Sequence, residues 1–279
     1  MPGGIHVASH HAGESGPSGA WSLTTVFTRS LRSLLWPTVW WTVGIAGFAA
    51  WMVIVVAQME TKLDKLLAGS PAAITLIRDL GGSSTLIIEG FLSAMFSFLP
   101  LFLMAFAVTQ VNRWSGDEQN GRLDLILAAA QPRLRVMLAR FGALTAAVTF
   151  IALITFLASA LAVGAGGLPI DTGRIAAATA GMIPLALLPA AIGYLAAGWL
   201  RTAADTGLLS FLLLAWFFIS FIGPELSWPS VVFKLSAFYY YGTPLLHGLE
   251  VTSMLAVIGA AALALIAGAV RFTHQDIRA

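Results

Sequence analysis

Residues 113–140, RWSGDEQNGRLDLILAAAQPRLRVMLAR, carry eight charged side chains between two long apolar runs. A charge stranded in the hydrocarbon core of a bilayer costs several kcal/mol, so this segment must lie in water beside the bilayer. Its order also matters: an amphipathic stretch, a proline, and then a basic start to the next apolar run. The chain is therefore predicted to cross a membrane several times, with an organised loop between two of its spans.

The composition supports this prediction. The 279-residue chain is 58% hydrophobic and 10% charged, whereas soluble domains are about 25% charged. A net charge of only +2 argues against nucleic-acid binding, and the absence of cysteine excludes disulfides and Cys-ligated metals. A helical span needs about 20 apolar residues. The fold is thus expected to be all-α with six transmembrane helices, at 36–58, 87–111, 136–163, 174–200, 206–223 and 248–270.

The distribution of basic residues predicts the orientation. With six spans both termini share one side, and that side receives ten of the 15 Lys and Arg residues, including those of 113–140. Because Lys and Arg are enriched in cytoplasmic loops, the termini and the 113–135 segment are expected to be cytoplasmic. We therefore expect a multi-pass protein of a prokaryotic cytoplasmic membrane.

The segments outside the spans are expected to differ in structure. Residues 1–20 and 271–279 are predicted to be cytoplasmic tails, the first disordered, on either side of a transmembrane domain over 36–270. Residues 21–35 have apolar and basic faces at helical spacing, which favours an interfacial helix; the alternative is that they extend the first span across Pro37. The extracytoplasmic segment 59–86 is predicted to hold two short helices, and the Pro-punctuated segment 224–246 a re-entrant or interfacial structure.

A short cytoplasmic helix is predicted from Asp117 to Ala130. Its apolar residues share one face, Glu118 and Arg122 have the i, i+4 spacing of an ion pair, and Pro132 ends it. From the residues alone, a solvated interfacial helix is as good an interpretation as a docking helix.

This segment resembles the cytoplasmic loop of type-2 ATP-binding-cassette (ABC) exporter permeases, whose pattern is roughly E-x-x-G-x-L-E-x-L-L-[AS] followed by P-x-x-R. The matching positions are Glu118, Gly121, Leu123, Asp124, Leu125, Leu127, Ala128, Pro132 and Arg135, with Arg140 at a later basic position. Asp124 replaces the more usual Glu. The stretches LSAFYYYGTPL (235–245) and RFTHQDI (271–277) also resemble family motifs, with substitutions, so the similarity extends over nearly the whole chain.

The resemblance implies a permease that pairs with an identical or homologous second permease and with two cytoplasmic ATPase subunits. The docking, or coupling, helix would then comprise Asp117, Glu118, Gly121, Arg122, Leu123, Asp124 and Leu127, and the basic start of the third span Arg133, Arg135 and Arg140. The chain has no P-loop and no Gly-Lys pair, so we expect it to bind no cofactor, with ATP and Mg on the separate ATPase. The implied function is outward transport of a drug, antibiotic or lipid.

One acidic residue, one methionine and five aromatic residues are candidates for the substrate pathway or gate. They are Glu89, Met95, Phe98, Phe102, Phe217, Tyr239 and Tyr240. Each also has a simpler interpretation. Glu89 begins the second span near the headgroups, the tyrosines suit an interfacial aromatic belt, and the others suit packing or lipid contact.

Two other functional classes remain open from the sequence. One is an intramembrane lipid-modifying enzyme, although the D-G-x-x-A-R…D-x-x-x-D pattern of phosphatidyltransferases is absent. The other is a membrane scaffold or sensor that uses an ATPase without transporting anything.

Overall fold

The computed structural model describes residues 21–68, 84–119, 133–197 and 202–276, and these ranges contain helices but no strand. The predicted tail at 1–20, the expected helix at 74–80 and most of the expected coupling helix lie outside the described residues. Of the predicted tail 271–279, residues 271–276 are instead the last turns of the helix that begins at Val251, and residues 277–279 lie outside the described residues. The long helices are α1 (Trp21–Ala68), α4 (Leu99–Gln119), α6 (Arg133–Gly166), α7 (Thr172–Ala197) and α12 (Val251–Asp276). The shorter ones are α3 (Ser84–Phe96), α8 (Thr202–Phe217), the π-helix η1 (Phe218–Ile222), α9 (Ser230–Phe233), α10 (Ala237–Tyr241) and α11 (Pro244–His247).

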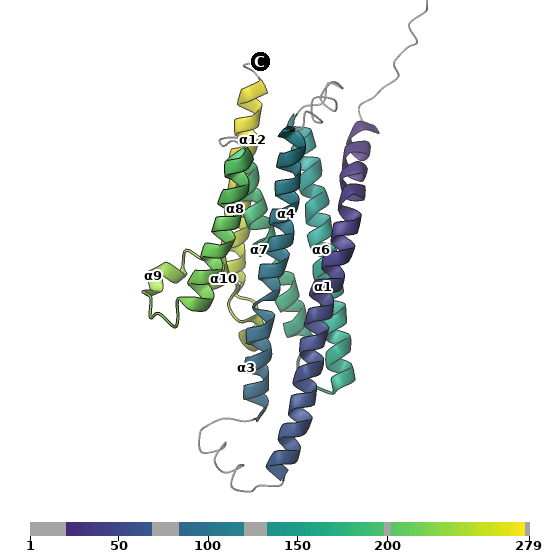
Figure 1. Cartoon of the computed structure of the whole chain (residues 1–279), viewed down its shortest axis with the longest axis vertical. Coiled ribbons are helices and arrows are strands. Elements are labelled where there is room, and N and C mark those ends of the chain that lie inside the picture. The colour runs from purple at the N-terminus through teal and green to yellow at the C-terminus, as the bar shows by residue number, and fades with distance from the viewer. Residues whose placement is uncertain (1–20, 69–83, 120–132, 198–201, 277–279) are drawn as a thin grey trace, which may run out of the picture.

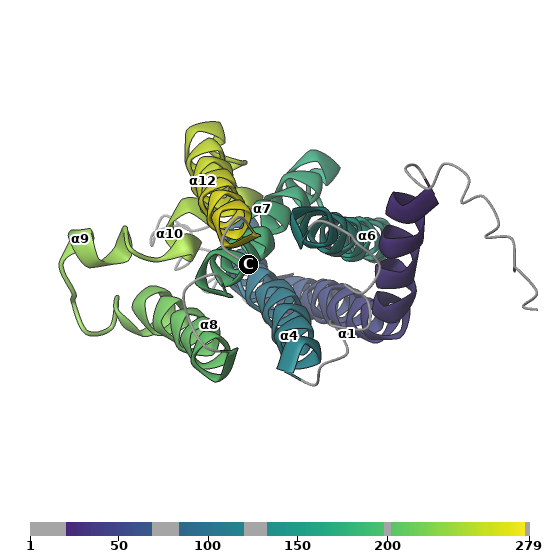
Figure 2. The ribbon, with the colours of Figure 1, turned by 90° about the horizontal axis from the view of Figure 1, so that it is seen from above.

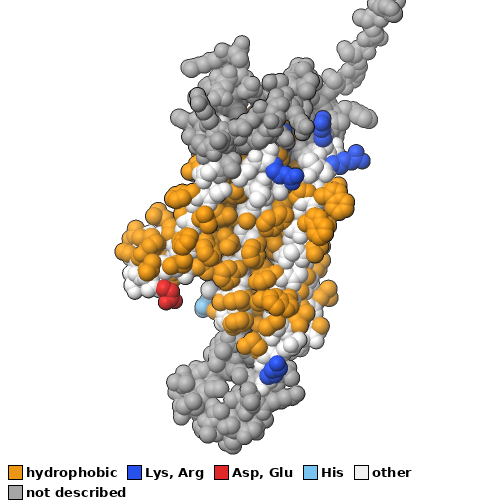
Figure 3. All heavy atoms as spheres, in the orientation of Figure 1, with side chains coloured by type: hydrophobic (Ala, Val, Ile, Leu, Met, Phe, Trp, Pro, Cys, Tyr) orange, Lys and Arg blue, Asp and Glu red, His pale blue; other side chains and the backbone are white. Residues whose placement is uncertain are grey.

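Five helical stretches are long and apolar enough to cross a membrane. They are Phe27–Met59, Glu89–Trp114, Leu134–Gly166, Thr172–Ala197 and Val251–Val270, and they match the expected spans except the fifth. At the expected fifth span the structure has a shorter apolar helix, Gly207–Ile222. Figure 3 shows a broad apolar surface on the bundle, with basic side chains beyond it at both ends. The membrane-protein class is confirmed, with five spans of sufficient length in the described ranges.

The first 15 residues of α1 are not a separate helix. Residues 21–35 were expected to form an interfacial helix, but α1 continues helically through Pro37 as one 48-residue element. A proline interrupts one backbone hydrogen bond without forcing the helix to end, and here the chain remains helical on both sides. The first turns tilt away from the direction of the later ones, as the view along the bundle shows (Figure 2). The predicted faces are confirmed over the described side chains, since Leu34 is buried while Arg29 and Arg32 are exposed.

The core of the bundle forms around α7. This helix contacts α4, α6, α8 and α12, and α1 packs along α6 (Figure 2). A small residue, Gly193, lets α7 pack closely against α4 and α8. A Cβ at Gly193 would lie 2.8 Å from a methyl carbon of Leu209 on α8 and 2.9 Å from one of Val111 on α4. In membrane helices such small residues let backbones pack closely where burial of apolar surface gives no advantage over lipid.

Two of the apolar helices depart from regular α geometry. The second span breaks into α3 and α4 at a turn over Ser97 and Phe98. Pro100 lies just beyond and has no N–H to donate, which removes the hydrogen bond that would normally reach back to residue 96. At the end of α8, the chain changes to π-helix geometry in η1, where the N–H of Gly223 donates to the carbonyl oxygen of Phe218 at 3.0 Å.

Four ends of the long helices lie together. α1 begins, α4 ends, α6 begins and α12 ends at the same end of the bundle (Figure 1). The expected extracytoplasmic piece Met59–Leu67 is not a separate helix but the last turns of α1. The segment 224–246, expected to be a re-entrant or interfacial structure, holds three short helices, the last of which ends at His247. Residues 230–247, from α9 to α11, are called the short-helix segment below.

Candidate functional site

Four phenylalanines connect the two irregular points of the fold. Phe221 on η1 stacks on Phe98 of the α3–α4 turn, with ring centroids 4.7 Å apart, and on Phe217 of α8 at 4.9 Å. Its third ring contact is edge-on with Phe238 of α10, at 5.7 Å. We call Phe98, Phe217, Phe221 and Phe238 the phenylalanine cluster. Ring pairs of this kind each stabilise a fold by about 0.5–1.5 kcal/mol beyond the effect of their buried area. The cluster therefore stabilises the packing of the broken second span against α8 and the short-helix segment.

Ser236 holds α10 against the π-helix. Its hydroxyl donates to the carbonyl oxygen of Trp216 at 3.1 Å, lies 2.7 Å from the hydroxyl of Ser220, and accepts from the N–H of Phe238 at 3.3 Å. The last contact makes Ser236 the N-cap of α10. The side chain is fully buried. π-helical turns are rare and are frequently found at functional sites, and this one contacts α10 through the Ser220–Ser236 pair as well as through Phe221.

Tyr241 and Arg174 attach the same segment to α7. The Tyr241 hydroxyl donates to the carbonyl oxygen of Ala178 at 3.0 Å. Burial raises the pKa of the Tyr241 phenol well above its usual value, so the group stays protonated and remains a donor. The Arg174 guanidinium donates through Nη1 to the carbonyl oxygen of Leu245 on α11 at 3.3 Å. The short-helix segment is therefore bonded to both α7 and α8–η1.

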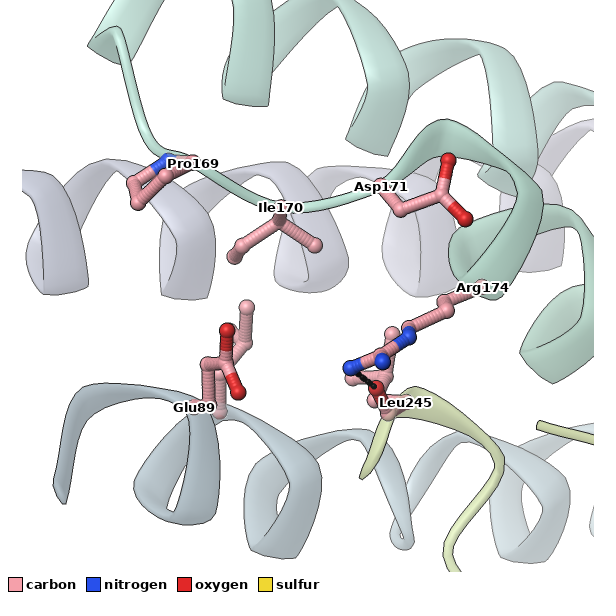
Figure 4. A pocket seen from close by; sticks show the side chains of 7 residues that line it. Glu89, Pro169, Ile170, Asp171, Arg174 and Leu245 are labelled. Atoms are coloured by element: carbon pink, nitrogen blue, oxygen red, sulfur yellow. Dashed lines mark hydrogen bonds between the residues drawn. The ribbon is translucent and has the colours of Figure 1, made fainter. Parts of the chain in front are cut away.

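A small polar pocket lies beside the Arg174 contact. It has a volume of about 180 Å³, and Glu89, Leu92, Pro169, Ile170, Asp171, Arg174 and Leu245 line it. Figure 4 shows the Glu89 carboxylate on one helix facing the Arg174 side across the pocket. Asp171 has a local role as well, because its Oδ1 accepts from the N–H of Gly173 at 3.0 Å in the first turn of α7. The pocket can accommodate a small polar group between an acid and a base.

The structure brings some of the predicted pathway residues together and separates others. Phe98 and Phe217 lie 6.5 Å apart within the phenylalanine cluster, and Glu89 lines the polar pocket. Tyr239 and Tyr240 contact each other edge-on at 5.5 Å, and Met95 is half-buried in α3. Phe102 lies elsewhere, edge-on against Phe48 of α1 at 5.5 Å.

The predicted docking residues fall at the edge of the described structure. Asp117 and Glu118 occupy the last turn of α4, and Arg133 is the first residue of α6. Arg135 and Arg140 follow on α6 with half-buried side chains. Gly121, Arg122, Leu123, Asp124 and Leu127 lie outside the described residues, so the coupling helix remains a prediction.

Ser236, Phe221 and Arg174 were not among the residues predicted from the sequence to form a site. Ser236 and Phe221 lack an individual signal, since one serine in LSAF and one phenylalanine among 17 look like any others. Arg174 was counted only as an extracytoplasmic charge. The position of Arg174 at the start of a span could have indicated a contact, because a charge there needs either a polar partner or water.

Comparison with protein families agrees with the residue motifs. The family model described as "Multidrug efflux system permease Rv1217c, C-terminal domain" matches residues 23–273. The curated proteins contain no match to this chain. The family match spans the α1-to-α12 bundle, and the resemblance to exporter permeases is thereby confirmed. The chain belongs to the family of the multidrug efflux system permease Rv1217c, C-terminal domain, and is a multi-pass membrane permease.

Proposed function

We propose that this chain is the transmembrane subunit of an ABC exporter that moves amphipathic or lipophilic molecules outward. The observation that carries the proposal is the multidrug efflux permease family match over residues 23–273. We further propose that two such permease subunits, identical or homologous, work with two cytoplasmic ATPases that bind ATP and Mg. Because residues 1–279 contain no P-loop, we propose that ATP binds to these ATPase subunits and not to this chain.

The arrangement of charges supports a cytoplasmic position for both termini. Of the eight Lys and Arg side chains that the structure describes, five lie at the end where α1 begins and α4 ends. These are Arg29, Arg32, Arg113, Arg135 and Arg140. The described carboxylates, Glu89, Asp171, Glu225 and Glu250, lie toward the other end. The excess of Lys and Arg at the end where α1 begins is what the positive-inside rule associates with the cytoplasmic side. We propose on this basis that α8 with η1 is a short sixth span.

The character of the described surfaces supports an apolar cargo. The phenylalanine cluster has half-buried rings rather than fully enclosed ones at three of its four positions, the exception being Phe238. Aromatic and apolar side chains with a few polar groups are typical of sites for drug-sized ligands. Nothing among the described residues specifically favours the lipid-modifying enzyme or the scaffold, so we propose no second function.

The proposal can be tested by co-expressing the chain with candidate ABC ATPase subunits from the same genome and measuring ATP hydrolysis in lipid nanodiscs. Glu118→Arg reverses a charge in the proposed docking helix, and we expect it to lower permease-dependent hydrolysis about tenfold or more, as loss of a central interface contact does. Glu225→Arg is the matched control, because it makes the same change at an exposed residue toward the other end. If the chain purifies without any ATPase, or if both variants behave alike, the exporter assignment is wrong.

A further inference from the structure

An apolar groove between α1 and α4 has no role in the proposal above. It has a volume of about 400 Å³, and Trp40, Trp41, Gly44, Ile45 and Phe48 of α1 line it with Phe102 of α4. That volume falls within the range of known ligand sites, about 300–1,000 Å³. Two ring contacts fix its walls: Phe48 meets Phe102 at 5.5 Å, and Trp41 meets Phe106 of α4 at 6.0 Å. No charged residue lines the groove.

A row of residues at strict four-residue spacing leads into this groove along α1. Its members are Arg32, Trp36, Trp40, Gly44 and Phe48. Residues four apart are neighbours on successive helical turns, so the row is a continuous path that winds gradually around the helix. Trp36 is 74% exposed and Trp40 69%, and Arg32 and Gly44 are also exposed. Two large indole rings thus stand open between a cation and an apolar groove.

The charged end of the row has no compensating group in the described structure. Arg29 lies beside Arg32 on the next turn, both are exposed, and neither has a hydrogen bond or ion pair with a described residue. The sequence from 27 to 59 contains no Asp or Glu. No carboxylate that the structure describes lies at this end of the bundle, and phosphate is an anion that arginine binds through paired N–H donors.

We propose that the row and the groove together bind one anionic membrane phospholipid, with its phosphate at Arg29 and Arg32 and an acyl chain in the α1–α4 groove. The length of the path suits this occupant. Arg32 and Gly44 are 12 residues apart in the sequence, which corresponds to roughly 18 Å along a helix. Half of a bilayer's hydrocarbon core is about 15 Å thick. The path therefore runs from the headgroup region to about the middle of the bilayer, as one phospholipid chain does, with Trp36 and Trp40 at the boundary that tryptophan prefers.

The phosphate end can be tested by native mass spectrometry of the full chain in mild detergent, titrated with phosphatidylglycerol or with phosphatidylcholine of the same acyl chains. We expect the wild type to retain phosphatidylglycerol preferentially. One arginine near an anionic lipid surface contributes about fivefold in affinity, so Arg29→Gln with Arg32→Gln should remove about 25-fold of the preference. Lys62→Gln is the control, since it removes an exposed cation from the other end of the same helix. Equal retention of the two lipids by the wild type, or an equal loss in the control, overturns the proposal.

The acyl-chain end has its own matched pair of variants. Gly44 lines the groove, and a Cβ built on it meets nothing within 4 Å, so Gly44→Leu fills the groove without a clash at its Cβ. Gly47 is equally open on the same helix but does not line the groove. We expect Gly44→Leu to lower phosphatidylglycerol retention at least tenfold and Gly47→Leu to leave it unchanged. If Gly44→Leu instead turns a dimer into a monomer with its lipid retained, the groove is a contact between two copies of the chain and the proposal is wrong.

Discussion

Replacing Ser236 by alanine tests whether one buried hydroxyl holds α10 to the π-helix. The change removes the N-cap of α10, which is typically worth about 1 kcal/mol. It also removes the bonds to Trp216 and Ser220, each worth about 0.5–1.5 kcal/mol in net terms. The sum gives an expected loss of about 2–4 kcal/mol in the free energy of unfolding. No cavity of consequence is created, because only one oxygen atom is lost.

The loss can be measured by reversible unfolding in mixed micelles, with circular dichroism followed against the fraction of denaturing detergent. Ser253→Ala is the control, since its hydroxyl donates a single bond, to Glu250 at 2.9 Å in an exposed position. Changes at such positions are usually within about 0.5 kcal/mol. If Ser236→Ala is no more destabilising than Ser253→Ala, the three contacts of Ser236 do not hold the segment and the reasoning is refuted.

Two further variant pairs test the packing around α7 by the same unfolding measurement. Gly193→Ala places a methyl group against α4 and α8, and we expect it to lower the free energy of unfolding by about 1–3 kcal/mol. Gly207→Ala lies in open space on α8 and should raise the free energy of unfolding by up to about 1 kcal/mol. The reverse order of the two effects would contradict the packing described. Tyr241→Phe removes the hydrogen bond to Ala178 and should lower the free energy of unfolding by about 1 kcal/mol. The Tyr240 hydroxyl makes no hydrogen bond within the described residues, so Tyr240→Phe should change the stability very little. Equal effects would show that the Tyr241 hydroxyl contributes nothing.

The positions of the spans could be predicted because apolar length is a local property. Five of the six expected spans correspond to helices of sufficient length, and the weakest prediction, 206–223, falls on the short helix Gly207–Ile222. The continuity of α1 could not be predicted in the same way. A proline at 37 and two arginines before it indicated a boundary, yet packing along α6 keeps the whole stretch helical.

The contacts of the candidate site could be predicted only in part. Aromatic content selected Phe98 and Phe217, and the structure places them in one cluster. The sequence did not show that Phe221 is the ring that joins them, because this depends on how α8, α10 and the α3–α4 turn meet in space. The docking helix is the opposite case: its motif is the clearest in the chain, and Gly121 to Leu127 lie outside the described residues.

The short-helix segment depends on its neighbours for its shape. Helices α9, α10 and α11 have four or five residues each, far fewer than an isolated helix needs to be stable in water, about 12–15. Their geometry must therefore come from tertiary bonds, and the structure shows where these are: Ser236 on α8–η1, Tyr241 and Arg174 on α7. A segment held at two different helices follows any change in the distance between them. Because Phe98 also stacks on Phe221, such a change reaches the turn in the second span, so the two irregular points of the fold are mechanically joined through η1.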